Sequence, residues 1–264
     1  MKKNIVFIMD IDLGGKGRFA SSRRAPYKFS IDSWKHWANK NNAEVFILND
    51  LLMSHEDMGI CWQRYYLFDI LDANEIEYDQ IAMVDADTII HPDCPNFFNE
   101  TYNKFGVTIN NGCYEWVTRS INSWGNALFP DEPKPKTWEY FNGGFQIVNK
   151  IHKPFYTAVA EFYQENIQVI NHYRNLIKAG TDQTIINYLT NLYEIEKHYL
   201  PECYNLQDLF TKNLLHLPGH SHFKDDLIFL DAGWIYHFNG IPTTPHNRDT
   251  AYWMERTYKY LYND

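Results

Sequence analysis

The first 90 residues alternate between short apolar runs and segments whose apolar residues recur at helical spacing. Runs rich in β-branched and aromatic residues at 4–9 and 45–48 predict two buried strands. Between them, Phe29, Trp34 and Trp37 predict a helix over 27–39, and a second helix is predicted from about 60 to 71. A further apolar run covers 81–90. Strands that alternate with helices predict an α/β fold with a mostly parallel central sheet.

The second half of the chain has a less regular pattern. Residues 105–109 and 145–148 predict strands, and the segment between them is rich in Trp, Pro and Gly. Helices are predicted over 157–177 and 182–188, with Thr181 as the cap of the second. No repeat or linker divides the chain, so we expect one domain over 1–264, with a regular half to about 100 and a less regular half from about 101.

The apolar run 81–90 is interrupted by Asp85 and Asp87. Side chains on a strand alternate between its two faces, so Asp85 and Asp87 are expected to point to the same face and Ala86 to the opposite one. Two carboxylates held close repel each other unless a cation joins them, and hard divalent ions prefer oxygen ligands. Parallel sheets also bind ligands at the carboxyl ends of their strands, where this pair lies. The alternative is that both acids simply end a strand at the water boundary.

Composition narrows the possible partners and location. The net charge of -9 argues against a nucleic-acid partner, which requires a basic surface. Four widely spaced cysteines without a C-x-x-C pair indicate reduced thiols rather than a disulfide framework or a zinc site. The apolar segment that follows Lys2 and Lys3 is too short for a signal peptide or a membrane span. We therefore expect no transmembrane segment and a cytoplasmic location.

Basic residues provide two further candidate binding groups. Arg64 lies on the apolar face of the predicted helix at 60–71, where it either pairs with Asp85, reaches a ligand phosphate or extends to the surface. The second candidate is the glycine-containing loop after the first strand, which either faces phosphates or an acidic acceptor, or is simply solvated. Four basic residues lie in this loop and a fifth follows it: Lys16, Arg18, Arg23, Arg24 and Lys28.

Three further segments follow the Asp85–Asp87 pair along the chain: FNGGF at 141–145, Asp182-Gln183, and HFNG at 237–240. In this order they resemble the GT-A glycosyltransferases, and most closely the retaining glycosyltransferase family 8, which includes glycogenin and bacterial lipopolysaccharide galactosyltransferases. The resemblance implies a GT-A, Rossmann-like fold in which about 1–100 bind the nucleotide sugar. The remainder, about 101–264, is expected to bind the acceptor and to carry the last metal-ligand segment. The implied activity is transfer of a hexose from a nucleotide diphosphate sugar, with UDP-hexose favoured, to a carbohydrate or glycoconjugate acceptor with retention of anomeric configuration.

The resemblance also implies roles for individual residues. Asp85, Asp87 and His237 are the implied metal ligands, and an imidazole beside two carboxylates favours Mn²⁺, with Mg²⁺ possible. The alternative for His237 is a structural core histidine. The implied residues around the sugar are Asn142, Asp182 and Gln183, and the other donor-binding candidates are Asp10, Asp12, Arg64, Gly143, Gly144, Gly240 and Arg248.

Two details of the roles implied by the resemblance stay open. The family has a lysine where this chain has Thr243, so Arg248 or His246 is expected to neutralise the diphosphate instead. Gln183 cannot be a carboxylate nucleophile, so retention requires the acceptor to attack on the leaving face of the donor. Asp182 as a covalent nucleophile is the competing mechanism.

Two other functions remain alternatives. Asp10-Ile11-Asp12, with Lys224-Asp225-Asp226 later, superficially resembles haloacid-dehalogenase phosphatases, although Leu13 and two glycines follow where those enzymes have Thr or Val. A non-catalytic protein that binds a sugar nucleotide or glycan on the same fold is the second alternative. His220 and His222 near Asp225 form either another metal site or part of an exposed loop.

Overall fold

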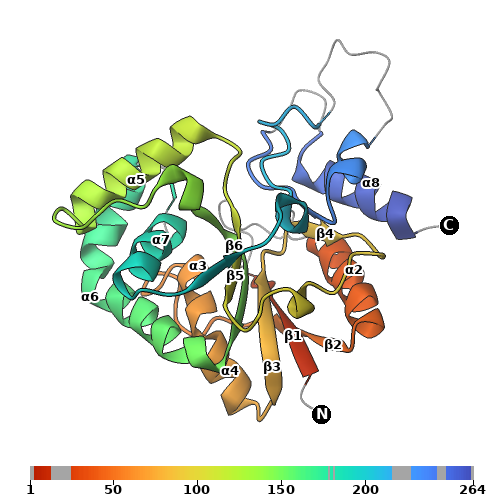
Figure 1. The fold of residues 1–264 in the computed structure, drawn as a ribbon, viewed down its shortest axis with the longest axis horizontal. Coiled ribbons are helices and arrows are strands. Elements are labelled where there is room, and N and C mark those ends of the chain that lie inside the picture. Colours follow the sequence, from red (N-terminus) through yellow and green to blue (C-terminus); the bar gives the residue numbers. More distant parts are fainter. Residues whose placement is uncertain are drawn as a thin grey trace.

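The computed structural model describes residues 3–12, 25–177, 179–180, 182–215, 227–242 and 248–262. Figure 1 shows how the elements are arranged. The strands are β1 (Lys3–Met9), β2 (Ala43–Leu48), β3 (Tyr78–Val84), β4 (Thr88–Ile90), β5 (Phe105–Ile109), β6 (Phe141–Asn149), β7 (Lys197–Tyr199) and β8 (Ile235–His237). The helices are α2 (Tyr27–Lys40), α3 (Ile60–Gln63), α4 (Leu67–Ala73), α5 (Tyr114–Leu128), α6 (Lys153–Ile177), α7 (Asp182–Leu192) and α8 (Thr250–Tyr262).

The central sheet has six strands in the order β2-β1-β3-β6-β5-β7. β1 pairs in parallel with β2 and β3, and β5 pairs in parallel with β7, whereas β6 runs antiparallel to its neighbours β3 and β5. The mostly parallel α/β sheet predicted from the sequence is therefore confirmed. Since β1, β2 and β3 are parallel, their carboxyl ends lie at one edge of the sheet, which is where Asp85 follows β3.

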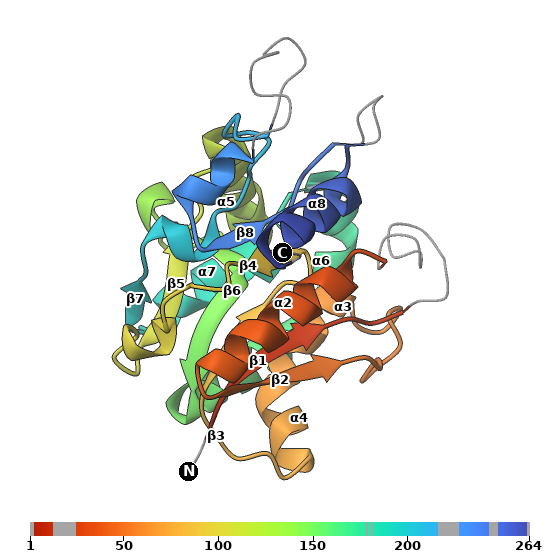
Figure 2. The same cartoon turned by 90° about the vertical axis from the view of Figure 1, so that its right-hand side faces the viewer.

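Both faces of the sheet are covered, which explains why its strands are continuous apolar runs rather than alternating ones. In β1, Val6 and Ile8 belong to the same hydrophobic cluster as Trp34 and Trp37 of α2. Figure 2 shows α2 lying across β1 and β2. Ile5 and Phe7 face the opposite cluster, which the helices α3, α4 and α6 also line.

A second, two-stranded sheet joins the two halves of the chain. β4 and β8 pair antiparallel, with Thr88 opposite His237 and Ile90 opposite Ile235. Tyr236 and Phe238 pack in a third cluster with Trp253 and Met254 of α8. This pairing brings His237 beside the segment that follows Asp87.

Two local expectations are corrected. The apolar run 81–90 is not one strand, because β3 ends at Val84 and the chain turns over Asp85–Asp87 before it pairs with β8 as β4. The premise that Asp85 and Asp87 share one face of a strand is therefore wrong, although both side chains still converge. The helix predicted at 60–71 is divided into α3, a 3-10 turn (Arg64–Tyr66) and α4. Tertiary contacts of the buried Gln63 and Arg64 at this break override the helical periodicity.

The other predicted elements are confirmed with shifted ends. The strand predicted at 145–148 is the interior of the longer β6, so Asn142, Gly143 and Gly144 lie in a strand rather than in a loop before it. Among the described residues, no helix combines the length and the apolar character needed to cross a membrane.

Candidate metal centre

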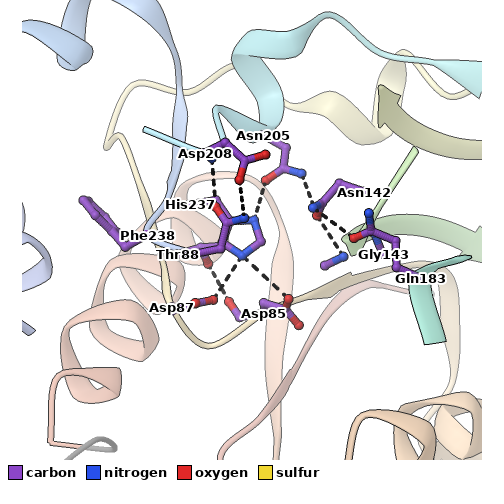
Figure 3. Close-up of polar contacts among 12 residues, drawn as sticks. Asp85, Asp87, Thr88, Asn142, Gly143, Gln183, Asn205, Asp208, His237 and Phe238 are labelled. Atoms are coloured by element: carbon purple, nitrogen blue, oxygen red, sulfur yellow. Dashed lines mark hydrogen bonds and ion pairs between the residues drawn. The ribbon is translucent and has the colours of Figure 1, made fainter. Parts of the chain in front are cut away.

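Three side chains from two distant parts of the sequence converge at the carboxyl end of β3. His237 Nε2 lies 3.1 Å from Asp87 Oδ1 and 3.7 Å from Asp85 Oδ2. In the described part of the chain, these three residues form the one group of His, Cys, Asp and Glu side chains whose ligand atoms all lie within 4.8 Å of one another. Figure 3 shows the imidazole of His237 above the two carboxylates. The sequence thus predicted a set of residues that the fold brings together.

Backbone hydrogen bonds hold the turn that carries both aspartates. Asp85 N donates to Gly144 O at 2.9 Å, and Phe238 N donates to Asp87 O at 2.9 Å. Thr88 Oγ1 donates to Asp85 O at 2.8 Å and accepts from Trp34 Nε1 at 2.9 Å. Both ends of the turn are therefore fixed to neighbouring elements, so the two carboxylates are positioned before any ligand binds.

Arg64 pairs with one of the two carboxylate oxygens of Asp85. Its Nη1 lies 2.9 Å from Asp85 Oδ1 and donates to Gly143 O at 3.2 Å, and its Nε is 3.9 Å from Asp182 Oδ2. Pairing with Asp85 is confirmed, and extension to the surface is wrong because Arg64 is only 9% exposed. Burial opposes the charge, but Asp85 and Asp182 outweigh it and raise the pKa of the guanidinium. Asp85 Oδ2 remains directed toward His237.

The electrostatics of the centre favour a cation. Burial lowers the pKa of His237, but the adjacent Asp87 and Asp85 outweigh burial and raise it. Burial raises the pKa of Asp87, but His237, together with a backbone hydrogen bond and Arg64, lowers it overall. The two carboxylates therefore draw a positive charge to the position between them and the imidazole, and a divalent ion can supply that charge.

Asn205 lies on the other side of the imidazole. Its Oδ1 lies 3.1 Å from His237 Nδ1, which leaves Nε2 for the carboxylates. Asn205 ends a 3-10 turn (Glu202–Asn205) far from every motif, so sequence reasoning missed it, and its pattern gives no signal.

Asp208 is a second residue that sequence reasoning missed. Its backbone N–H donates to Asn239 Oδ1 at 2.9 Å, and Asn239 Nδ2 donates to its carboxylate at 3.1 Å. Burial raises the pKa of this carboxyl, and His237 opposes the shift. These bonds fix the turn after β8, in which Gly240 has a φ of +63° that favours glycine.

The two glycines of β6 allow the strand to pass close to the centre. A Cβ on Gly144 would lie 2.2 Å from Asp85 Oδ2 and 2.8 Å from His237 Cε1. At Gly143 the nearest atom would be Gln183 Cβ at 3.2 Å. Only glycine at 144 leaves room for the aspartate and the histidine in these positions.

A network of amides lies beside the metal centre. Asn142 Oδ1 accepts from Gly144 N at 2.9 Å, and Gln183 Oε1 accepts from Gly143 N at 3.1 Å and from Asn142 Nδ2 at 3.3 Å. Gln183 Nε2 is buried and has no hydrogen-bond partner within the described residues. The structure thus brings Asn142 and Gln183 together with an amide donor left for a ligand.

Asp182 lies in the same region but is engaged with protein groups. Tyr65 OH donates to Asp182 Oδ2 at 3.4 Å, and this is the oxygen nearest Arg64. Burial raises the pKa of Asp182, Arg64 opposes the shift, and Asp85 adds to it.

The remaining predicted residues have less defined roles. Asp10 and Asp12 follow β1, the strand beside β3, at the same edge of the sheet. The Arg248 guanidinium stacks 5.7 Å from the ring centre of Tyr252. The four cysteines are free thiols. Several candidates lie outside the described residues: Lys16, Arg18, Arg23, Arg24, Thr181, His220, His222, Lys224, Asp225, Asp226, Thr243 and His246.

Comparison with known proteins gives a likeness in structure. No protein-family model matches the chain, and no curated protein matches it. The crystal structure of a glycosyltransferase involved in the glycosylation of the major capsid of PBCV-1 is similar, with a TM-score of 0.57 and 10% identity over 95% of this chain and 98% of that chain. The apo form of the glycosyltransferase GlyE from Streptococcus pneumoniae TIGR4 has a TM-score of 0.52 and 12% identity over 99% of this chain. This chain spans 62% of that longer GlyE chain. The likeness concerns the fold, and the chain has the α/β, GT-A type of fold that these glycosyltransferases share.

Proposed function

We propose that this protein is a metal-dependent glycosyltransferase that moves a hexose from a nucleotide diphosphate sugar, UDP-hexose first, to a carbohydrate or glycoconjugate acceptor. The observation that carries the proposal is the convergence of Asp85, Asp87 and His237 in a fold that glycosyltransferases share. Two carboxylates and an imidazole suit Mn²⁺ better than Mg²⁺, which prefers oxygen and water. A bound divalent ion would stabilise the charge that develops on the leaving diphosphate.

Different residues of the chain are assigned to the metal ion and to different parts of the nucleotide sugar. Arg64 holds Asp85 Oδ1, so that Asp85 Oδ2 and Asp87 face the ion position together with His237 Nε2. Gly143 and Gly144 let β6 approach the donor, and Asp10 and Asp12 at the carboxyl end of β1 are assigned to the base and ribose. Residues up to about 100 hold the nucleotide, and the part from about 101 binds the acceptor and also supplies the last metal-ligand segment. Gly240 and Arg248 are assigned to the diphosphate.

Gln183 is assigned to the donor sugar. Its Oε1 is occupied by Gly143 and Asn142, while its Nε2 has no partner in the described part of the chain and can donate to a sugar hydroxyl. Asn142 is then a positioning residue that acts through Gln183. Retention follows if the acceptor attacks on the leaving face and its proton passes to the leaving phosphate. Asp182 Oδ2 lies 3.9 Å from Arg64 Nε and accepts a hydrogen bond from Tyr65 OH at 3.4 Å, and these contacts favour this mechanism over a covalent Asp182 intermediate.

Calorimetry of UDP binding in Mn²⁺ and in EDTA tests the proposal. We expect measurable affinity in Mn²⁺ and its loss after chelation, and Asp87→Asn should abolish turnover while it preserves the fold. Asp93→Asn is the matched control, because Asp93 is a mostly exposed acid that pairs with Lys40. Undiminished UDP affinity in EDTA would overturn the metal bridge.

His237→Ala separates a metal ligand from a core histidine. The metal-ligand role predicts a much higher Mn²⁺ requirement with little change in the melting of the metal-free protein. Loss of metal-free stability with an unchanged Mn²⁺ requirement would instead identify a core histidine.

Donor turnover separates the proposal from its alternatives. A non-catalytic binder would bind UDP-hexose without hydrolysing or transferring it. A phosphatase would release phosphate from p-nitrophenyl phosphate and lose that activity with Asp10→Asn. The structural likeness to glycosyltransferases supports the transferase over the phosphatase, whereas donor turnover decides between a transferase and a binder on the same fold.

A further inference from the structure

The amide network beside the metal centre has only one consistent arrangement of donors and acceptors. The backbone N–H of Gly144 can only donate, so the Asn142 atom that it meets at 2.9 Å is Oδ1. Gly143 N likewise identifies the Gln183 atom at 3.1 Å as Oε1, which agrees with Asn142 Nδ2 donating to it. The orientation of Asn142 is therefore set by the backbone of β6.

Asn142 in turn sets the orientation of Asn205. The Asn205 atom 3.2 Å from Asn142 Oδ1 is a donor, Nδ2, and its second hydrogen is directed to Thr108 Oγ1 at 3.1 Å. The opposite end of the same amide is then Oδ1, which faces His237 Nδ1 at 3.1 Å. A carbonyl oxygen can only accept, so Nδ1 of His237 must carry a proton.

We propose that Asn205 is a positioning residue that keeps the proton of His237 on Nδ1 and thereby directs Nε2 toward Asp85 and Asp87. Asn205 is completely buried and His237 is 2% exposed, so water cannot replace this bond without rearrangement. The backbone amide of Gly144 thus determines the tautomer of a histidine through two asparagine side chains. Where the inference concerns Mn²⁺ it rests on the proposed function, whereas the hydrogen bond itself does not.

The bond can be tested in the metal-free protein by NMR of ¹⁵N-labelled histidine in EDTA, at a pH at which the imidazole of His237 is neutral and the ¹⁵N chemical shifts show which ring nitrogen carries the proton. We expect the Nδ1–H proton of His237 in the wild type to exchange slowly with water. Asn205→Ala should make this exchange much faster, whereas Asn205→Asp retains an acceptor and should preserve the slow exchange. Rapid exchange of this proton in the wild type would overturn the assignment.

Mn²⁺ affinity, measured by electron paramagnetic resonance, provides the second readout. Loss of an outer hydrogen bond to a ligating histidine typically costs about 10- to 100-fold in metal affinity, which is the decrease expected for Asn205→Ala. Asn205→Asp should remain close to the wild type. In a His237→Ala background, Asn205→Ala should cause no further loss, because the two residues act through one interaction.

A matched control excludes a general loss of stability. Asn149 is also a buried amide, at the opposite end of β6, where its Nδ2 donates to Asn103 O at 2.9 Å. Asn149→Ala should lower the melting temperature without changing Mn²⁺ affinity. Equal Mn²⁺ affinity in the wild type and Asn205→Ala would overturn the positioning role. A wild type with a protected Nδ1–H but no Mn²⁺ binding would instead overturn the proposed function and leave the assigned bond standing.

Discussion

Gly144 and Asp85 are so close that a methyl group on Gly144 would lie 2.2 Å from the Asp85 carboxylate, well inside van der Waals contact. Gly144→Ala should therefore displace Asp85 while the buried strand β6 keeps its pairing. A misplacement of about 1 Å can cost about 100-fold in rate, so we expect at least that loss of turnover. Transfer assays and Mn²⁺ titration measure the effect.

Gly59 provides the control for this substitution. A Cβ there would lie 3.5 Å from Trp62 and 3.6 Å from Arg174, which are ordinary contacts. Gly59→Ala should keep wild-type activity and Mn²⁺ affinity. Full activity in Gly144→Ala would mean that Asp85 can move without consequence and would contradict its assignment as a ligand.

Arg64→Met should destabilise the protein strongly. The change leaves Asp85 and Asp182 without their shared partner in a site where Arg64 is 9% exposed. Removal of one partner from a buried ion pair costs about 3–5 kcal/mol, so we expect the free energy of unfolding in urea to fall by about that amount. Mn²⁺ should restore part of the loss, since Asp85 is one of the proposed metal ligands.

Arg119→Met tests whether loss of any arginine ion pair has this effect. Arg119 pairs with Glu115 at 2.9 Å on the exposed face of α5. Exposed pairs at this helical spacing contribute about 0.3–0.5 kcal/mol. A comparable loss in both variants would show that the position of Arg64 between the two acids is unimportant.

The sequence predicted the central strands because both of their faces are buried, which makes each strand a continuous apolar run. It could not predict where β3 ends. That end depends on the pairing of Ile90 with Ile235, a contact between residues far apart in the chain. The Asp85–Asp87 pair was found for a partly wrong reason, since a turn rather than one strand face brings the carboxylates together.

The residues that surround the metal ligands could not be predicted from the sequence for a similar reason, because their roles depend on contacts between segments far apart in the chain. Asn205 is one polar residue in a short 3-10 turn, and its importance lies only in what it contacts. Arg64 could be recognised, because a charged residue on an apolar helix face requires a partner. Its second partner, Asp182, depends on how α7 packs against the sheet and has no local signature.

His152 should make stability depend on pH in the acid range. Burial lowers its pKa from 6.5 to about 4, and its Nδ1 accepts a hydrogen bond from Asn149 N, which requires an unprotonated nitrogen. As pH falls through 6.5, the unfolded chain binds a proton that the folded protein does not, so stability decreases until about pH 4. The loss from this group is about 3 kcal/mol.

Urea unfolding of the wild type and His152→Gln at several pH values measures this contribution. Gln can still accept from Asn149 N but does not titrate, so the variant should lose less stability between pH 6.5 and pH 4. Identical pH dependence in the two proteins would mean that His152 is protonated as easily in the folded state as in the unfolded one.

The stereochemistry of the product distinguishes the possible mechanisms. We expect the product to keep the anomeric configuration of the donor, and NMR of the first-formed product measures it. Inversion would require a catalytic base, and the first candidates are the acids between β5 and β6: Glu115, Asp131, Glu132 and Glu139. Glu115 and Glu139 pair with Arg119 and Lys136, and Asp131 and Glu132 are exposed, so the described structure favours none of them as a buried base.

If the product retains its configuration, the choice between Asp182 and Gln183 can be tested by trapping. A covalent mechanism predicts a glycosyl adduct on Asp182 by mass spectrometry and complete loss of activity in Asp182→Asn. The arrangement of Asp182 against Arg64 and Tyr65 instead predicts no adduct and a residual rate in that variant, together with reduced stability.

Gln183→Ala should then lower turnover more than it lowers UDP affinity, because Gln183 Nε2 is assigned to the sugar rather than to the nucleotide. An Asp182 adduct, or an equal loss of UDP affinity and turnover in Gln183→Ala, would contradict this assignment.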